Sequence, residues 1–157
     1  MNDNFDTFIN NLQEEIFDEA KKALGEAGFQ RWQNPEYNGP LQNYDTSAQV
    51  KGECGDTMEI FLKFDKNRIK SASYVTNGCA SSSICGSFTA ELAMGKNPDE
   101  LTEITGDAVL KKIGGLPEED RHCAFLAAKT LQEALQCYMS RETKKNQEHL
   151  KKTGREK

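Results

Sequence analysis

The sequence lacks a long apolar run and an excess of positive charge. No window approaches the roughly eighteen apolar residues of a membrane-spanning helix. The first residues are acidic and amphipathic, without the basic start and continuous apolar run of a signal peptide. We therefore expect an intracellular, cytoplasmic chain with no membrane partner. The net charge of -5 argues against a nucleic-acid partner.

Signs of a disulfide framework are also missing. The chain has five cysteines, and an odd number argues against simple pairing. No Cys-x-x-Cys pair occurs, although such pairs dominate zinc ribbons and fingers. In a reducing compartment, cysteines act as metal ligands, as nucleophiles or as small buried residues. The five cysteines must be divided among these roles.

What is present fits one domain with polar ends. The chain has 157 residues, of which 36% are hydrophobic and 29% are charged. The mean hydropathy of -0.74 indicates that polar ends dilute a core. We divide the chain into an N-terminal amphipathic helix (1–30), a central domain (31–140) and a polar C-terminal tail (141–157). The tail is expected to be solvated helix or disordered chain.

The spacing of apolar residues predicts an α+β fold. Apolar residues recur at helical intervals over about residues 4–27, which predicts a long N-terminal helix ending near Gly25 or Gly28. The expected strands are 45–52, 57–64 and 68–76, with a tight turn at 65–67. One helix is expected at 80–94, and two short helices are expected to start at 97 and at 105. A final long helix is expected to include 127–138. This order predicts a small three-stranded antiparallel sheet with helices packed on one face.

The first candidate site residue, Cys54, lies among glycines at the mouth of a predicted strand. Gly52 and Gly55 allow a sharp turn and the close approach of a ligand. On an extended chain, residues two apart point the same way, so Cys54 and Asp56 are able to share one ion. The alternative is an ordinary turn with a buried thiol.

The second candidate, Cys79, opens the helix expected at 80–94, directly after Gly78. A helix N-terminus carries partial positive charge and unpaired N–H groups, and both favour thiolate over thiol. Thiolate is the form that binds metal or attacks sulfur. Gly78 leaves space around this sulfur.

The third candidate is the dipeptide His122-Cys123, near the start of the final helix. An adjacent imidazole is able to pair with a thiolate or to supply a nitrogen ligand. A histidine beside a cysteine on a helix is more often structural. The position at a helix start favours a functional role for this pair.

The remaining two cysteines fit structural roles. Cys85 shares a predicted helix face with Phe88, which favours a small buried side chain. It lies about 240° around the helix from Cys79, so these two thiols are not expected to share an ion. Cys137 lies late in the final helix, well beyond Cys123, and is expected to be structural.

Three cysteines remain, each at the end of a predicted element. Cys54, Cys79 and Cys123 are separated by 25 and 44 residues, so they would converge from three separate loops. Such a site would be shallow and open. An open site suits a group that is built and handed on, whereas a structural metal is usually enclosed.

These motifs resemble those of the NifU/IscU family of iron–sulfur cluster scaffolds, including its SufU branch. The resemblance covers about residues 31–138. Asn34-Pro35 followed by Asn38-Gly39 resembles the N-terminal loop signature of the family. Its three cysteine motifs resemble Cys54-Gly55-Asp56, Gly78-Cys79 with the serines at 81–83, and Leu116-Pro117 through His122-Cys123.

The resemblance implies a scaffold and not an enzyme. Members accept sulfur as persulfide from a cysteine desulfurase, bind iron, assemble a [2Fe–2S] cluster and transfer it to apo iron–sulfur proteins. Zn²⁺ or Fe²⁺ is an expected occupant of the isolated protein. Carried over, the implied metal ligands are Cys54, Asp56, Cys79 and Cys123, with His122 as an alternate ligand. The three cysteines are also the implied persulfide acceptors, and Lys96 is implied to lie near the site.

Two departures from the family pattern bear on partners and branch. The bacterial chaperone-binding version reads Leu-Pro-Pro-Val-Lys before its His-Cys, whereas Leu116-Pro117 is followed here by three acidic residues. This substitution argues against a dedicated Hsp70-type chaperone. His122 and the short spacing between the second and third motifs favour the IscU side over the SufU branch.

Two other hypotheses use the same residues. In the first, the ligands hold Zn²⁺ and one cysteine is released to accept persulfide, so the chain stimulates a cysteine desulfurase without carrying a cluster. In the second, His122 activates Cys123 as the nucleophile of an enzyme, which requires a third group to orient the base. Asp120 is near in sequence, but residues two apart on a helix diverge.

Overall fold

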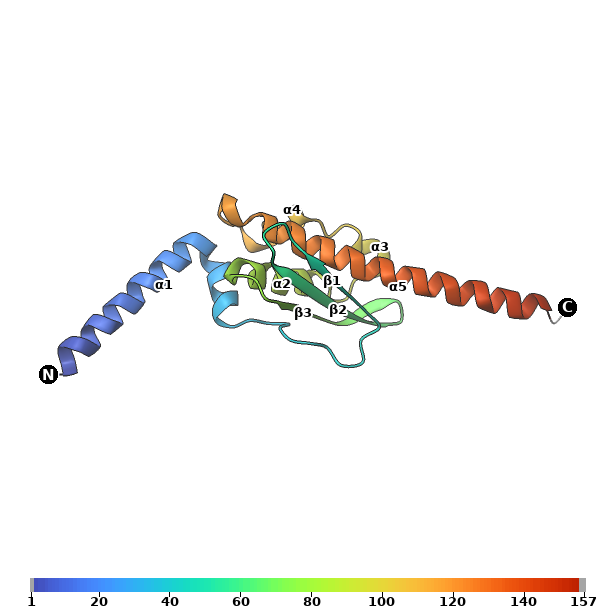
Figure 1. Cartoon of the computed structure of the whole chain (residues 1–157), viewed down its shortest axis with the longest axis horizontal. Coiled ribbons are helices and arrows are strands. Elements are labelled where there is room, and N and C mark those ends of the chain that lie inside the picture. Colours follow the sequence, from blue (N-terminus) through green and yellow to red (C-terminus); the bar gives the residue numbers. More distant parts are fainter. Residues whose placement is uncertain (1, 156–157) are drawn as a thin grey trace.

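The computed structural model describes residues 2–155. They form a three-stranded antiparallel sheet and a set of helices, so the predicted α+β fold class is confirmed (Figure 1). The elements are α1 (Asn2–Gln33), β1 (Thr46–Lys51), β2 (Thr57–Asp65), β3 (Arg68–Thr76), α2 (Ala80–Ala93), α3 (Pro98–Leu101), α4 (Gly106–Ile113), the 3₁₀ turn η1 (Glu118–Asp120) and α5 (His122–Arg155).

The sheet has the order β1-β2-β3, with β2 in the centre. In the register of the sheet, Ile60 of β2 lies between Ala48 of β1 and Tyr74 of β3. Lys66 and Asn67 join β2 to β3 with positive φ angles of 51° and 64°. Two left-handed residues in a row match the twist of the flanking strands, which explains the tight hairpin. The expected strands and their turn are confirmed.

The core lies between the sheet and the helices α2 and α5. Alternate residues of β2 point into it, and Met58, Ile60 and Leu62 are completely buried. The central stripe of α5 covers them, because β1 and β2 both pack against this helix. The buried Thr46 hydroxyl donates to the Ala134 carbonyl at 2.8 Å and so ties β1 to α5. The sheet and α5 are therefore packed together as one unit.

Helix α1 differs from the predicted helix of about residues 4–27. It continues to Gln33, and Gly25 interrupts it with φ 76° and ψ 168°. Glycine adopts positive φ without a steric cost, so the first helical segment ends at Gly25, as expected, and a second segment continues to Gln33. Residues 2–24 form an arm that points away from the domain, and residues 26–33 return to it (Figure 1).

Helix α5 carries the C-terminal tail, which the structure shows as helix up to Arg155. This part projects from the domain at the end opposite the α1 arm (Figure 1). Its residues beyond Ser140 are largely exposed and polar, as expected for solvated helix. Within residues 2–155, no helix combines the length and the apolar character needed to cross a membrane.

Candidate metal centre

The three cysteine motifs meet at one end of the sheet. Cys54 Sγ lies 3.2 Å from His122 Nε2, although 68 residues separate them in sequence. The Ser82 hydroxyl lies 3.2 Å from Asp56 Oδ2 and 3.4 Å from Cys123 Sγ. The structure therefore brings together the loop after β1, the start of α2 and the start of α5.

The loop between β1 and β2 carries Cys54 and Asp56. The Gly52 amide donates to the Asp56 carbonyl at 2.7 Å, and the Gly55 amide donates to the Gly52 carbonyl at 3.0 Å. Gly55 has φ 87°, a conformation that glycine adopts without strain. This compact turn exposes Cys54 at its tip and leaves Asp56 half-buried at the start of β2.

The junction between β3 and α2 is fixed to the start of β2. The Thr57 amide donates to Asn77 Oδ1 at 2.8 Å, and the Thr76 hydroxyl donates to the Thr57 carbonyl at 2.7 Å. A Cβ atom on Gly78 would lie 2.6 Å from Ser82 Oγ and 2.7 Å from Asp56 Oδ2. Gly78 therefore permits the close approach of the two cysteine motifs, which extends the role expected for it.

Cys79 and His122 occupy helix starts. Cys79 is the N-cap residue of α2 and is exposed. His122 is the first residue of α5, and its Nε2 lies 3.2 Å from Cys54 Sγ and 3.6 Å from Cys123 Sγ. The imidazole thus stands between the first and the third cysteine.

Cys123 is the buried cysteine of the three, with 1% of its surface exposed. Burial raises the pKa of its thiol to about 11, the neighbouring Cys79 and Asp120 add to this rise, and the hydrogen bond from Ser82 opposes it. The thiol is therefore protonated at neutral pH in the metal-free protein. This state argues against the hypothesis that Cys123 is an activated enzyme nucleophile.

Ser82 is a site residue that the sequence interpretation missed. It is completely buried, and its hydroxyl contacts Asp56, Cys123 and, at 3.9 Å, Cys79 Sγ. The serine run at 81–83 was visible in sequence. Ser82 follows Cys79 by three residues, so the two share one face of the helix. This spacing could have identified Ser82 as a site residue.

The other two cysteines lie outside this cluster. Cys85 is completely buried in the core, as expected, and burial raises the pKa of its thiol. Cys137 is exposed on α5, so the expectation that it packs as a structural residue is wrong. The buried stripe of α5 passes through Leu131 and Ala134, and Cys137 faces away from it.

The implied position of Lys96 near the site is also wrong. Lys96 follows the C-terminal end of α2, whereas Cys79 precedes its N-terminal end. The 14 residues of α2 span about 20 Å. Lys96 Nζ instead lies 3.9 Å from a carboxylate oxygen of Glu100.

The side chains gather without yet forming a closed coordination sphere. Across residues 2–155, no three His, Cys, Asp or Glu side chains already meet in the geometry of a metal site. Asp56 reaches the cluster through Ser82, and Cys54 reaches it through His122. Thiolate, imidazole and carboxylate are nevertheless ligands that suit zinc and iron. Cys54 and Cys79 are exposed, so their side chains have room to turn toward one ion.

A groove of about 350 Å³ opens beside the cluster, between the end of β1 and the start of α5. Gly52 and Glu53 border it on one side, and His122, Phe125 and Lys129 border it on the other. Phe125 is 48% exposed. The groove gives an incoming group access to the face of the cluster that carries His122.

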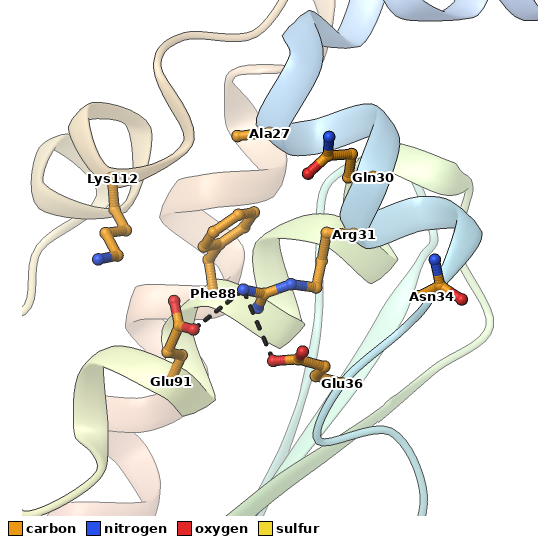
Figure 2. Close-up of a pocket in the computed structure, with 8 residues that line it drawn as sticks. All are labelled: Ala27, Gln30, Arg31, Asn34, Glu36, Phe88, Glu91 and Lys112. Carbon is orange, nitrogen blue, oxygen red and sulfur yellow. Dashed lines mark hydrogen bonds and ion pairs between the residues drawn. The ribbon is translucent and has the colours of Figure 1, made fainter.

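A second pocket of about 500 Å³ lies between the end of α1 and α2 and contains none of the cluster residues (Figure 2). Arg31 occupies it, with its guanidinium 4.0 Å above the Phe88 ring. The guanidinium also donates to Glu91 at 3.0 Å and to the Ser87 hydroxyl at 3.0 Å. These contacts hold the end of α1 against α2, so Arg31 has a structural role.

Comparison with known proteins agrees with this arrangement. The chain matches the family described as NifU-like N terminal domain over residues 25–145. It is 37% identical over 130 residues to the iron-sulfur cluster assembly scaffold protein IscU 1 of Archaeoglobus fulgidus, covering 82% of this chain and 84% of that protein. It is 30% identical over 121 residues to the iron-sulfur cluster assembly enzyme IscU of Drosophila melanogaster, covering 74% and 78%.

Solved structures share the fold. The N-terminal part of a nitrogen-fixing NifU-like protein from Brucella abortus superimposes with a TM-score of 0.61 at 20% identity, covering 77% of this chain and 97% of that chain. A putative SUF-system scaffold protein from Fervidobacterium islandicum gives 0.60 at 20% identity, covering 73% and 98%. The family match spans most of the sequence, and this chain therefore belongs to the family of NifU-like N-terminal domains.

Proposed function

We propose that this chain is a scaffold on which an iron–sulfur cluster is assembled and then passed to an apo-protein. The observation that carries this function is the meeting of three cysteines from three separate segments, two of them exposed. The Archaeoglobus relative is named as such a scaffold, which supports the proposal. The cluster is cargo in this function.

The proposed ligands are Cys54, Asp56, Cys79 and Cys123, with His122 as an alternate. Thiolates hold iron–sulfur clusters, and a carboxylate is a harder ligand that exchanges more readily. Asp56 contacts Ser82, and His122 contacts Cys54, so both lie beside the cysteines. A mixed ligand set of this kind holds a [2Fe–2S] cluster without enclosing it, which suits release.

The proposed sulfur source is a cysteine desulfurase that carries a persulfide. A cysteine thiolate of this chain attacks the outer sulfur, a new S–S bond forms, and the donor cysteine leaves as thiolate. Cys54 and Cys79 are exposed and open to this attack, whereas Cys123 is buried. The groove beside His122 leads to Cys54. Sulfide formation then requires two electrons from an external reductant.

Other proposed properties follow from the same residues. All five cysteines are free, and free thiols persist in a reducing compartment, so we place the chain in the cytoplasm. The acidic residues of η1 argue against a dedicated Hsp70-type chaperone as partner. The names of the relatives favour cluster assembly over the alternative, a zinc-bound persulfide acceptor. Zn²⁺ or Fe²⁺ remains the proposed occupant before assembly.

Anaerobic reconstitution with iron and sulfide tests the function. We expect visible charge-transfer absorption with iron and acid-labile sulfide in equal amounts. Cys79→Ser should lose this absorption, whereas Cys137→Ser should keep it, because Cys137 is exposed outside the cluster. Retention of zinc with no visible absorption in the wild type would support the persulfide acceptor instead.

Transfer kinetics test the part assigned to Asp56. The Asp56→Ala variant removes the exchangeable oxygen ligand, so it should retain the cluster longer than the wild type. The measurement is the rate at which an apo-ferredoxin gains its own cluster spectrum. An unchanged rate would contradict the assignment of Asp56 as the ligand that controls release.

A further inference from the structure

We propose that this chain forms a closed dimer in which the N-terminal arm of each copy docks on the C-terminal extension of the other. The arm is residues 2–24 of α1, and the extension is residues 139–154 of α5. Both surfaces lie outside the metal centre, so this inference goes beyond the proposed function and does not depend on it.

The arm carries an exposed apolar stripe. Its members recur at intervals of four, three and four residues, so they share one face of the helix. They are Phe5, Ile9, Leu12 and Ile16, with Phe8 beside them. All except Ile9 are between 43% and 65% exposed. An exposed row of large apolar side chains marks an interaction surface.

A different face of the arm holds it against the second segment of α1. The Phe17 ring packs edge-on against the Phe29 ring, with the ring centroids 5.9 Å apart. Phe29 in turn packs against the core of the domain. This contact anchors the arm without using the stripe, which is left free for a partner.

The extension offers a stripe with the same spacing of four, three and four residues. Its members are Met139, Thr143, Asn146 and Leu150, none of which is charged. Met139 is 45% exposed and Leu150 is 68% exposed. The Thr143 hydroxyl donates to the Met139 carbonyl at 2.9 Å, which leaves the methyl group of Thr143 for contact. The two stripes therefore match in length and in spacing.

The two surfaces carry opposite charge. Residues 3–19 of the arm contain six acidic residues and no basic residue. Residues 141–154 of the extension contain five basic and two acidic residues, a net charge of +3. Opposite potentials attract an arm to an extension and disfavour the pairing of two arms or of two extensions.

The partner is a second copy, because each arm points away from the extension of its own chain (Figure 1). A two-fold rotation places each arm beside the extension of the other copy. Both contacts then form together, and the assembly closes at two copies.

The area of contact fits a specific dimer. At about 200 Å² for a whole large side chain, the exposed stripe supplies roughly 400 Å² of each arm. Two arm–extension contacts, with both sides counted, bury about 1,600 Å², which is a standard size for a specific complex.

Sedimentation equilibrium of the 157-residue chain tests the dimer. We expect a monomer–dimer equilibrium with a Kd on the order of 10 µM. Raising NaCl from about 50 mM to about 500 mM should weaken it by roughly tenfold, because salt screens exposed charges. A chain that stays monomeric at about 500 µM in low salt, or that forms species larger than a dimer, would overturn the proposal.

A matched pair of variants tests the stripe. Leu12→Asp places a charge in its centre and should weaken the dimer by at least about tenfold. Asn10→Asp adds the same charge on the opposite face of the arm and should change the Kd by less than about twofold. Far-UV circular dichroism verifies that both variants keep their helices. Equal effects of the two substitutions would contradict the docking of this face.

Charge reversal identifies which surfaces meet. One chain has a reversed arm, with Glu14→Lys, Glu15→Lys, Asp18→Lys and Glu19→Lys, and the other has a reversed extension, with Lys144→Glu, Lys145→Glu, Lys151→Glu and Lys152→Glu. Each chain alone should be monomeric, because its arm and its extension then carry the same sign. An equimolar mixture should form a one-to-one dimer. A dimer of the extension-reversed chain alone would show that arms pair with arms, and a monomeric mixture would equally refute the arm–extension contact.

Discussion

At the scale of single residues, the centre depends on how closely its segments approach. Gly78 has no side chain, and this lets Ser82 and Asp56 lie side by side across the junction of β3 and α2. The contacts there involve the ends of polar side chains as well as the Cβ of Ser82. A small added group at this position should therefore separate ligands without unfolding the sheet.

Gly78→Ala tests this dependence. The added Cβ would stand 2.6 Å from Ser82 Oγ, so the Ser82–Asp56 hydrogen bond should break. We expect Zn²⁺ affinity to fall by about tenfold to a hundredfold, as for the loss of other groups that support metal ligands. Competition with a chromophoric chelator measures it. Gly154→Ala is the control, because its added Cβ would meet open space.

The pKa of Cys123 makes a second residue-scale prediction. Folding raises it from 9.0 to about 11, so the folded state favours the protonated thiol. This contribution to stability is complete below about pH 9 and is lost as the pH rises toward about 11. The free energy of unfolding of metal-free protein, measured with urea across this range, should fall less steeply in Cys123→Ala. Parallel curves for the two proteins would contradict the assignment.

At the scale of elements, one side chain fastens α1 to the helix that carries Cys79. The Arg31 side chain is 12% exposed, stacks on Phe88 and pairs with Glu91 at 3.0 Å. Removing Arg31 leaves Glu91 without its partner in a half-buried place. The α1–α2 contact should therefore be sensitive to this residue.

Arg31→Ala should lower the free energy of unfolding by about 2 kcal/mol. Arg68→Ala is the matched control, since Arg68 also pairs with a glutamate, Glu100, at 3.3 Å but is 57% exposed. An exposed pair contributes about 0 to 1 kcal/mol. Urea unfolding of both variants gives the comparison, and equal losses would show that the buried stacking of Arg31 adds nothing.

The elements also show what a sequence is able to predict. The β2 strand was predictable because the buried Met58, Ile60 and Leu62 recur at every second position, as a sheet with one covered face requires. The end of the first helical segment at Gly25 was predictable from the glycine, whereas the second segment that continues to Gln33 was not. Cys137 was misplaced because a small thiol carries little information on helix phase.

The candidate centre was predictable to a similar extent. Cys54, Cys79 and Cys123 stood out because each precedes or opens a regular element. Ser82 was missed because its function depends on contacts with residues 26 and 41 positions away. The position of Lys96 came from family likeness, and the length of α2 carries it to the other end of the helix.

At the scale of the whole molecule, two helical extensions leave the domain in different directions (Figure 1). In the α1 arm, Phe5, Phe8 and Ile16 are exposed, whereas Leu24, at its base, is buried. The arm therefore contributes little to the core. The division of the chain into a helix, a central domain and a tail leads to a prediction about truncation.

A chain that starts at residue 24 should keep its Zn²⁺ affinity and its free energy of unfolding within about 1 kcal/mol of the full chain, because the arm is exposed. A chain that starts at residue 34 should lose several kcal/mol, because it lacks Leu24, Phe29 and Arg31. Urea unfolding and chelator competition measure both quantities. Equal free energies of unfolding for the two truncated chains would show that residues 24–33 are not part of the folded domain.

The separation of the three cysteines along the chain has a consequence for synthesis on the ribosome. Cys54 and Cys79 leave the exit tunnel well before Cys123, and the centre stays incomplete until α5 has docked on the sheet. A metal ion that binds only the folded centre, at a free concentration of a hundred times its Kd, would stabilise the fold by about 2.7 kcal/mol. A truncated chain that lacks α5 would offer Cys54 and Cys79 without Cys123, so we expect it to retain metal poorly.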